Sequence, residues 1–429
     1  MKNKAFFKNL KEYLKKKNSP LSTFEYINPG DYIGYKILKF LINKKNFLSI
    51  LIFSVKNFLS LFIQNYHFVF NKDKKKISFK KIIITWGFEE NFDVNGNFRD
   101  KYLNIISNKT SKEYLWIVVY LDKKLPNKIS RNILIYKEIQ KKISFFNFFC
   151  SIVKIYKSSK KDIFLTIKSL NKNSIFAINF REQINKAISF NKTKKLFFVY
   201  EGQPYQKYFI EGLKKQNLKI YGILHHPPHS LLFNFFYQKN ITPHKLIVSG
   251  NLTKDILIKK YNWKKENIIS LPSFRNKKKK KNKKEIFISS NIYHRLKVAK
   301  YLEQTVESLK YNITNYKISF HPNIKKNKSE KSFENQINQI KSNSSKFNYK
   351  PRNVNFCIGV SSVIIELLES GIKVIHVTEV PTIEKYDNHL WKYINIKKIT
   401  NKSFMYSLKK NNAIHHIENR NSLEMINKL

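Results

Sequence analysis

Three short polar motifs stand directly after apolar runs, and their side chains are of types that move protons or bind phosphate. They contain Glu201, His321 and the pair Ser361-Ser362. A partly desolvated carboxylate can remove a proton from a hydroxyl group, and an imidazole can bind or protonate a phosphate. Hydroxyl groups at a helix start can bind a phosphate too, so the serine pair in particular would suit a nucleotide.

The serine pair lies in a segment, residues 357–375, that predicts a strand, a turn, a helix and a second strand. Gly359 permits a tight turn after the first strand. Ser361 and Ser362 then fall at the helix N-terminus, where backbone N–H groups and the helix dipole favour an anion. The two serines could equally do no more than cap the helix, because serine is a preferred N-cap residue.

Glu201 and His321 each stand at the end of a predicted strand. Glu201 could act as a general base on a sugar hydroxyl, or it could be an acid that stabilises a helix start. His321 precedes Pro322, which fixes the turn, so its imidazole could bind a phosphate or donate a proton to a departing one. A histidine with a purely structural role is the alternative.

Further candidates stand near other strand ends. Glu366 lies four residues after Ser362, on the same helix face, and could bind a ribose hydroxyl or remain a solvated charge. The remaining candidates are Gly202, His225 and His226 on an acceptor side, Arg275 near a hinge as a donor-phosphate partner, and Ser289, Ser290 and Asn291 as nucleotide contacts.

Continuous apolar runs separated by helical patterns predict two Rossmann-like α/β domains, because parallel strands are buried on both faces. Strands are expected at 81–86, 115–120, 133–136, 196–200, 219–224, 245–249, 285–290 and 317–320, and helices at 203–217, 251–262 and 293–311. Ligands bind beyond the carboxyl ends of such strands, so two facing domains would enclose a cleft. The expected parts are a helical N-terminal extension (1–80), a first domain (81–273), a Lys-rich linker (274–284), a second domain (285–390) and a helical tail (391–429).

An acidic residue before glycine, then His-Pro, then Ser-Ser, in that order across two Rossmann-like halves, resembles the bacterial sialyltransferases and polysialyltransferases of GT-B fold. Kdo transferases and glycerophosphotransferases share that architecture. Residues 200–214 and 222–226 also resemble a group of uncharacterised surface-carbohydrate biosynthesis proteins. One departure is that the sialyltransferases often have two acids before the glycine, whereas Tyr200 occupies the first place here.

The resemblance implies an inverting, metal-independent transfer from a nucleotide-activated sugar, preferably a CMP-linked acidic sugar, with no cofactor. Glu201 would be the base towards the acceptor hydroxyl. His321 would hold the CMP phosphate and assist its departure, and Ser361 and Ser362 would complete the phosphate site. The first domain would hold the acceptor, a glycan or lipid-linked glycan of lipopolysaccharide, capsule or another surface polysaccharide, and the second would hold the nucleotide sugar.

The formal charge of +53 would suit nucleic acid, yet only 7 of the 82 basic residues are arginine. Proteins that read bases and clamp phosphates rely on the arginine fork. The abundance of Lys, Asn, Ile, Phe and Tyr indicates AT-rich codons instead. A CDP-polyol phosphotransferase of the same fold and a basic nucleic-acid-binding protein are the two alternative functions.

The expected compartment is the cytoplasm. The first 25 residues lack the apolar core of a secretory signal, and Cys150 and Cys357 stand in apolar sequence without metal-ligand spacing. Residues 36–64 are rich in apolar side chains, but Lys56 and Asn57 interrupt them, so no membrane span is expected. They could form an interfacial helix on the inner face of the cell membrane, attracted by its anionic lipids, or pack against the next domain.

Overall fold

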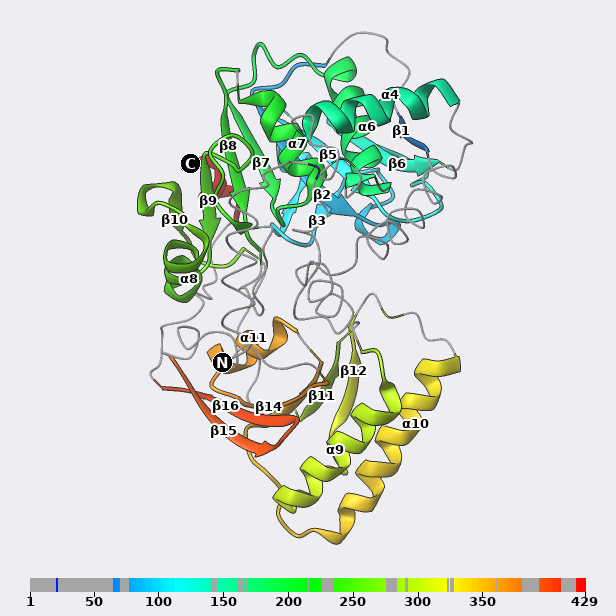
Figure 1. Ribbon diagram of the computed structural model, residues 1–429, viewed down its shortest axis with the longest axis vertical. Helices are drawn as coiled ribbons and strands as arrows, with labels where there is room; N and C mark the ends of the chain where they lie inside the picture. Colours follow the sequence, from blue (N-terminus) through cyan, green and yellow to red (C-terminus); the bar gives the residue numbers. More distant parts are fainter. Residues whose placement is uncertain are drawn as a thin grey trace.

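The computed structural model of the 429-residue chain contains two α/β lobes (Figure 1). The structure describes residue 21 and residues 65–69, 77–110, 112–139, 145–159, 166, 169–170, 172–214, 216–225, 235–274, 284–289, 292–321, 324, 328–359, 361–379, 393–409 and 422–429. Within these residues the strands form an eight-stranded sheet, a six-stranded sheet and a two-stranded ribbon. The expectation of two Rossmann-like α/β units is confirmed.

The first sheet has the strand order β1-β6-β5-β2-β7-β8-β9-β10, and it is parallel from β6 to β10. Its strands are β1 (Asn65–Val69), β2 (Lys81–Gly87), β5 (Tyr114–Tyr120), β6 (Ile133–Ile139), β7 (Lys195–Val199), β8 (Lys219–Ile223), β9 (Lys245–Val248) and β10 (Ile268–Ser270). All seven residues of β5 are buried, which is the pattern of a strand covered on both faces.

The two faces of this sheet are covered by different elements. Ile82 and Ile84 of β2 belong to the apolar cluster that includes α6 (Lys172–Ala187), α7 (Pro204–Leu213) and α8 (Asn251–Tyr261), while Ile83 belongs to the opposite cluster. The opposite cluster contains residues around β3 (Arg99–Asp100) and β4 (Ile105–Ile106), and also the last helix, α12 (Ser422–Asn427). This alternation follows the two-residue period of a strand.

The second sheet has the order β12-β11-β13-β14-β16-β15, and it is parallel from β12 to β14. Its strands are β11 (Glu285–Ile288), β12 (Lys317–Phe320), β13 (Val354–Ile358), β14 (Lys373–Val377), β15 (Ile394–Thr400) and β16 (Ser403–Leu408). Helices α9 (Arg295–Leu309) and α10 (Lys328–Asn343) cover one face. Helix α11 (Val363–Glu369) covers the other face, on the side of the first lobe (Figure 1).

Two of the expected helical regions contain strands. Residues 65–69, in the extension expected to be helical over 1–80, form the edge strand β1 antiparallel to β6. Residues 394–408, in the tail expected to be helical over 391–429, form the antiparallel hairpin β15–β16, and only α12 is helical among the tail residues that the structure describes. Alternation of apolar and polar residues from Ile394 favours such an edge strand over a helix.

A helix occupies a stretch where the sequence predicted none, and two of the expected regions lie outside the described residues. Helix α10 occupies much of the polar stretch 323–350, and it buries Phe333, Ile337 and Ile340 at helical spacing. Helix α4 (Phe145–Ser158) and α6 precede β7; Cys150 on α4 is partly exposed, whereas Cys357 is buried as expected. Residues 36–64 and the Lys-rich run 275–283 lie outside the described residues. No helix in the described part has the length and hydropathy needed to cross a membrane.

Helix α12 returns the C-terminus to the first lobe (Figure 1). Ile426 is fully buried in the apolar cluster that contains Trp116. Asn427 Oδ1 accepts hydrogen bonds from the Tyr114 hydroxyl at 2.5 Å and from Lys81 Nζ at 3.2 Å. The Tyr221 hydroxyl donates to the Leu429 carbonyl oxygen at 2.9 Å. The last eight residues are therefore part of the first lobe, although they follow the second in sequence.

Replacing Ile426 by alanine should lower the free energy of unfolding of the first lobe by about 2–4 kcal/mol, because the change removes fully buried methyl and methylene groups and leaves a cavity. Denaturant unfolding followed by tryptophan fluorescence measures this, since Trp116 lies in the same cluster. Glu424→Ala, on the exposed side of the same helix, is the control and should change stability by about 0.5 kcal/mol or less. Equal stabilities of the two variants would contradict this packing.

Candidate functional site

A tight turn at the carboxyl end of β7 presents Glu201. Gly202 adopts a φ of 68°, a left-handed conformation that favours glycine. The fully buried Gln206 of α7 fixes this turn: its Oε1 accepts from the backbone N–H of Glu201 at 3.0 Å and of Gln203 at 3.1 Å. Its Nε2 donates to the Val199 carbonyl oxygen at 2.7 Å. The Gln203–Gln206 pair resembles one half of a capping box, which is the sequence signal that could have revealed Gln206.

The Glu201 carboxylate is oriented within a polar and aromatic environment. Its side chain is 30% exposed, and Gln203 Nε2 donates to Oε2 at 2.7 Å. Its Oε1 lies 3.8 Å from Nε2 of His225, which follows β8 and is almost fully buried. That separation is too long for a hydrogen bond but short enough for electrostatic attraction to a protonated imidazole. The structure therefore brings together Glu201 and His225, two of the residues expected from the sequence.

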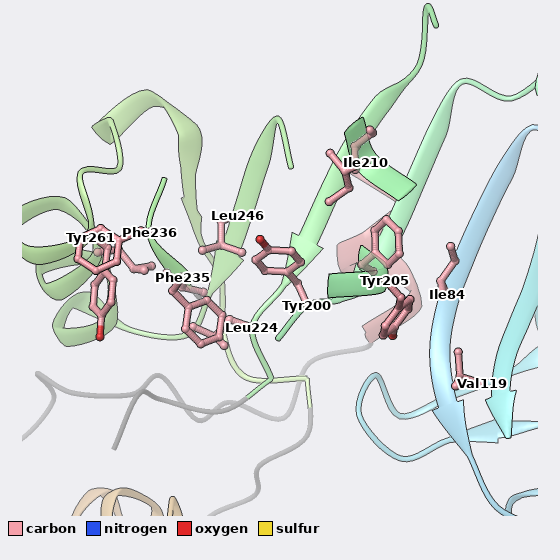
Figure 2. Packing of buried hydrophobic residues seen from close by; sticks show 14 of the residues in the cluster. Ile84, Val119, Tyr200, Tyr205, Ile210, Leu224, Phe235, Phe236, Leu246 and Tyr261 are labelled. Carbon is pink, nitrogen blue, oxygen red and sulfur yellow. The ribbon is translucent and has the colours of Figure 1, made fainter. Parts of the chain in front are cut away.

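Aromatic side chains surround this pair. The Tyr102 ring packs against the His225 ring with centroids 4.6 Å apart. Tyr205 lies with Ile84 and Ile210 among the buried side chains between α7 and the sheet (Figure 2). Burial, followed by the negative charge of Glu201, raises the pKa of Tyr205 well above its usual value. Tyr205 therefore stays a neutral phenol beside the carboxylate.

The carboxyl edge of the second sheet gathers the expected donor-side residues. His321 follows β12 and its N–H donates to the Ile288 carbonyl oxygen at 2.9 Å, while the N–H of Ser289, after β11, donates to the Ile358 carbonyl oxygen at 2.9 Å. Gly359, after β13, has a φ of 78°, and a Cβ there would lie 3.0 Å from the Ser289 Cβ. These bonds set the loops after β12, β11 and β13 side by side at one edge.

The serine pair after β13 has divided roles. Ser361 precedes the N-cap residue Ser362 of α11. Its Oγ accepts from the Val363 N–H at 3.3 Å, and its carbonyl oxygen accepts from the Ile364 N–H at 3.3 Å. The N–H groups of the first helical turn are therefore already engaged by the protein. Ser362 and Glu366 are both half-buried on this short helix, and the Glu366 N–H donates to the Ser362 carbonyl oxygen at 3.3 Å. A phosphate held here would depend on hydroxyl groups more than on these N–H groups.

A buried histidine that the sequence did not single out secures the Gly359 turn. The Nε2 atom of His376, on β14, lies 3.0 Å from the Gly359 carbonyl oxygen. Its Nδ1 atom lies 3.1 Å from the Tyr406 hydroxyl oxygen. A carbonyl oxygen can only accept, so Nε2 carries the proton and Nδ1 accepts from Tyr406. Burial lowers the pKa of His376 from 6.5 to about 4, and the imidazole is neutral near pH 7.

A carboxylate also occupies the N-terminus of α9. Glu379, after β14, lies 3.0 Å from His294 Nδ1, and its Oε1 accepts from the Tyr293 N–H at 2.5 Å. Sequence patterns gave no sign of this pairing, because the two partners are 85 residues apart. The negative charge at this helix start comes from the protein itself, and it comes from a residue outside the helix, since α9 has no acidic residue in its own first turn.

Four expected site residues, His226, Arg275, Ser290 and Asn291, lie outside the described residues. Among the residues that the structure does describe, no group of three or more His, Cys, Asp or Glu side chains is arranged to hold a metal ion. The described candidates thus form two sets, Glu201 with Gly202 and His225 on the first sheet, and His321, Ser289, Ser361, Ser362 and Glu366 on the second.

No model of a known protein family matches the chain, and no curated protein matches it. Similar solved structures include a glycosyltransferase from Rickettsia africae ESF-5, which is 13% identical with a TM-score of 0.34 over 72% of this chain and 82% of that one. An α,α-trehalose 6-phosphate synthase from Burkholderia multivorans is 7% identical, with a TM-score of 0.35 over 70% and 84% of the two chains. A UDP-forming trehalose-phosphate synthase from Burkholderia vietnamiensis is 8% identical, with a TM-score of 0.35 over 70% and 85%. Such similarity says nothing about individual site residues.

Replacing His376 by glutamine should flatten the dependence of stability on pH. The folded pKa of His376 lies below the unfolded value of 6.5, so its contribution is fully present above pH 6.5 and is lost as the pH falls towards 4. The loss amounts to about 1.4 kcal/mol per pH unit in that window. Glutamine keeps an N–H that can reach the Gly359 carbonyl oxygen and does not titrate.

Urea unfolding of both proteins between pH 4 and pH 7 measures this effect, with the slopes compared across the window set by His376. His244, whose pKa burial also lowers to about 4, is present in both proteins and contributes equally. Parallel curves for the wild type and the variant would show that His376 is protonated, or not buried, in the folded protein.

Proposed function

We propose that the chain is a glycosyltransferase that moves a sugar from a nucleotide-activated donor to an acceptor hydroxyl. The observation that carries the proposal is the Glu201 carboxylate, which emerges at the carboxyl end of a parallel strand, partly exposed and oriented by the Gln203 amide. A carboxylate oriented in this way can accept a proton in the reaction without first rearranging. Support comes from the second sheet, where the loops after β11, β12 and β13 lie side by side and contain Ser289, His321 and Ser362. Their hydroxyl and imidazole groups are of types that bind phosphate.

The reaction would be an inverting displacement. Glu201 takes the proton of the acceptor hydroxyl while the oxygen attacks the anomeric carbon of the donor sugar. The bond between that carbon and the phosphate oxygen breaks, and the electron pair leaves with the nucleotide. Attack opposite the leaving group inverts the anomeric centre, which is why the base and the phosphate site belong to different lobes in this proposal.

The nucleotide would be held at the carboxyl edge of the second sheet. His321 would donate a hydrogen bond to the departing phosphate oxygen, and the hydroxyl groups of Ser289 and Ser362 would bind the remaining oxygens. Glu366, half-buried after the serines, would accept from a ribose hydroxyl. These groups can stabilise a monophosphate leaving group without a metal or a cofactor.

The preferred donor is a CMP-linked acidic sugar, and the product would belong to lipopolysaccharide, capsule or another surface glycan. In this proposal the protein would work in the cytoplasm, at the inner face of the cell membrane. The excess positive charge of the chain would draw it towards anionic lipids and towards an anionic donor.

Glu201→Gln should reduce nucleotide release from CMP-N-acetylneuraminate by about 10²–10⁴-fold, because the amide keeps the shape of the carboxylate but cannot accept a proton. Calorimetric binding of CMP should be unchanged, since the base contacts the acceptor. Glu266→Gln, an exposed acid on the first lobe, is the matched control and should retain full activity.

Retention of wild-type turnover by Glu201→Gln would exclude Glu201 as the base. Mass spectrometry of the product would then distinguish sugar transfer from transfer of a polyol phosphate out of a CDP-linked donor, since only the latter adds phosphorus to the acceptor.

A further inference from the structure

The indole of Trp86 has a buried hydrogen-bond donor with no acceptor in the described part of the chain. Trp86 stands near the carboxyl end of β2, and its Nε1–H is buried without a partner. Two other tryptophans show the usual arrangement: Trp116 Nε1 donates to Thr110 Oγ1 at 2.9 Å, and Trp263 Nε1 donates to the Phe235 carbonyl oxygen at 2.7 Å. A buried donor left unpaired costs free energy, so a ligand oxygen that reached this strand end would gain a hydrogen bond from it.

Trp86 belongs to the same neighbourhood as Glu201. Its ring meets the Tyr205 ring edge to face, with centroids 5.6 Å apart. Tyr205 lies close enough to Glu201 and to Tyr102 for both to raise its pKa, after burial itself. The indole, the two phenols and the carboxylate therefore form one group at the carboxyl edge of the first sheet.

Tyr102 is held in this group by a buried carboxylate. Asp100 is fully buried, and its Oδ1 accepts from the backbone N–H groups of Tyr102 at 2.7 Å and of Leu103 at 2.5 Å. Its Oδ2 accepts from the hydroxyl of Thr85, the residue next to Trp86 on β2. The same strand thus fixes both aromatic residues, and the Tyr102 ring in turn contacts His225.

The chemistry of this group fits a sugar. Sugars present apolar C–H faces, which pack on aromatic rings, together with hydroxyl groups that need both donors and acceptors. Here the rings come from Trp86 and Tyr102, the donors from the indole N–H and the Gln203 amide, and the acceptor is the Glu201 carboxylate. Apart from His225 the group holds no cationic side chain, so it is poorly suited to a phosphate.

We propose that Trp86 and Tyr102, with Gln203 and Glu201, form a carbohydrate-binding acceptor site, in which Trp86 Nε1–H donates a hydrogen bond to an oxygen of the acceptor glycan. The role as acceptor site rests on the proposed glycosyltransferase function. The binding of carbohydrate by these residues does not.

A glycan array probed with the fluorescently labelled full-length protein tests the site, with dissociation constants then measured for the glycans that bind. Trp86→Phe keeps an aromatic ring but removes the N–H together with the second ring of the indole, so affinity should fall by at least about three- to tenfold, the loss expected for one neutral hydrogen bond. Tyr102→Ala should weaken binding at least as much. Trp263→Phe removes an indole N–H elsewhere in the same lobe and should leave glycan affinity unchanged.

Calorimetric titration of the same proteins with CMP separates this inference from the proposed function. CMP binding without glycan binding, or equal glycan affinity of Trp86→Phe and the wild type, would overturn the acceptor site and leave the donor site standing. Glycan binding that depends on Trp86, without binding of CMP, would support the carbohydrate site and contradict the proposed donor. Binding to vesicles that carry a polyprenyl phosphate, with no glycan bound, would overturn the assignment to carbohydrate.

Discussion

Strands buried on both faces constrain where this protein can place polar side chains. Every residue of β5 is buried, and β7 and β8 are buried from their second residues onward. A charged or strongly hydrogen-bonding side chain inside such a strand lacks solvation unless the protein pairs it, as it pairs His376 in β14. The candidate site residues Glu201, His225 and His321 stand instead where the chain leaves the sheet. Because parallel strands all end at the same edge, their terminal residues are brought together even when they are far apart in sequence.

Buried polar groups convert these strand ends into defined turns. Gln206 holds the turn that presents Glu201, Asp100 holds the turn that presents Tyr102, and His376 holds the Gly359 turn before the serines. Each is paired through hydrogen bonds to backbone groups, so its burial costs little, whereas losing one partner would leave the others unsatisfied. The residues that contact substrate in this account are therefore positioned by residues that do not.

The sequence was sufficient for features that depend on local pattern. Apolar runs located β2, β5, β7, β8 and β9 to within one residue or so, and the Gly359 turn was expected from the glycine that a positive φ favours. Hairpin β15–β16 and helix α10 were missed because their surfaces are polar on one side, so their apolar residues are too few to stand out from a loop.

The site was only partly predictable for a different reason. Glu201, His225 and His321 could be found because each directly follows an apolar strand. Pairing of His294 with Glu379, and of His376 with Gly359 and Tyr406, depends on strand order in the folded sheet, which no spacing in the chain encodes. Likewise, Trp86 became notable only when its N–H proved to be buried without an acceptor in the described part of the chain.

The central claim is that the carboxyl edge of the second sheet holds the nucleotide of the donor through His321. Thermal-shift measurements with CMP, CDP, UDP, GDP and ADP test it most directly, at high ionic strength so that screening suppresses unspecific attraction of anions to the positive chain. The account predicts that CMP raises the melting temperature of the wild type, that the other nucleotides do not, and that the rise is lost in His321→Ala. A shift of equal size in His321→Ala, or no shift with any nucleotide, would contradict it.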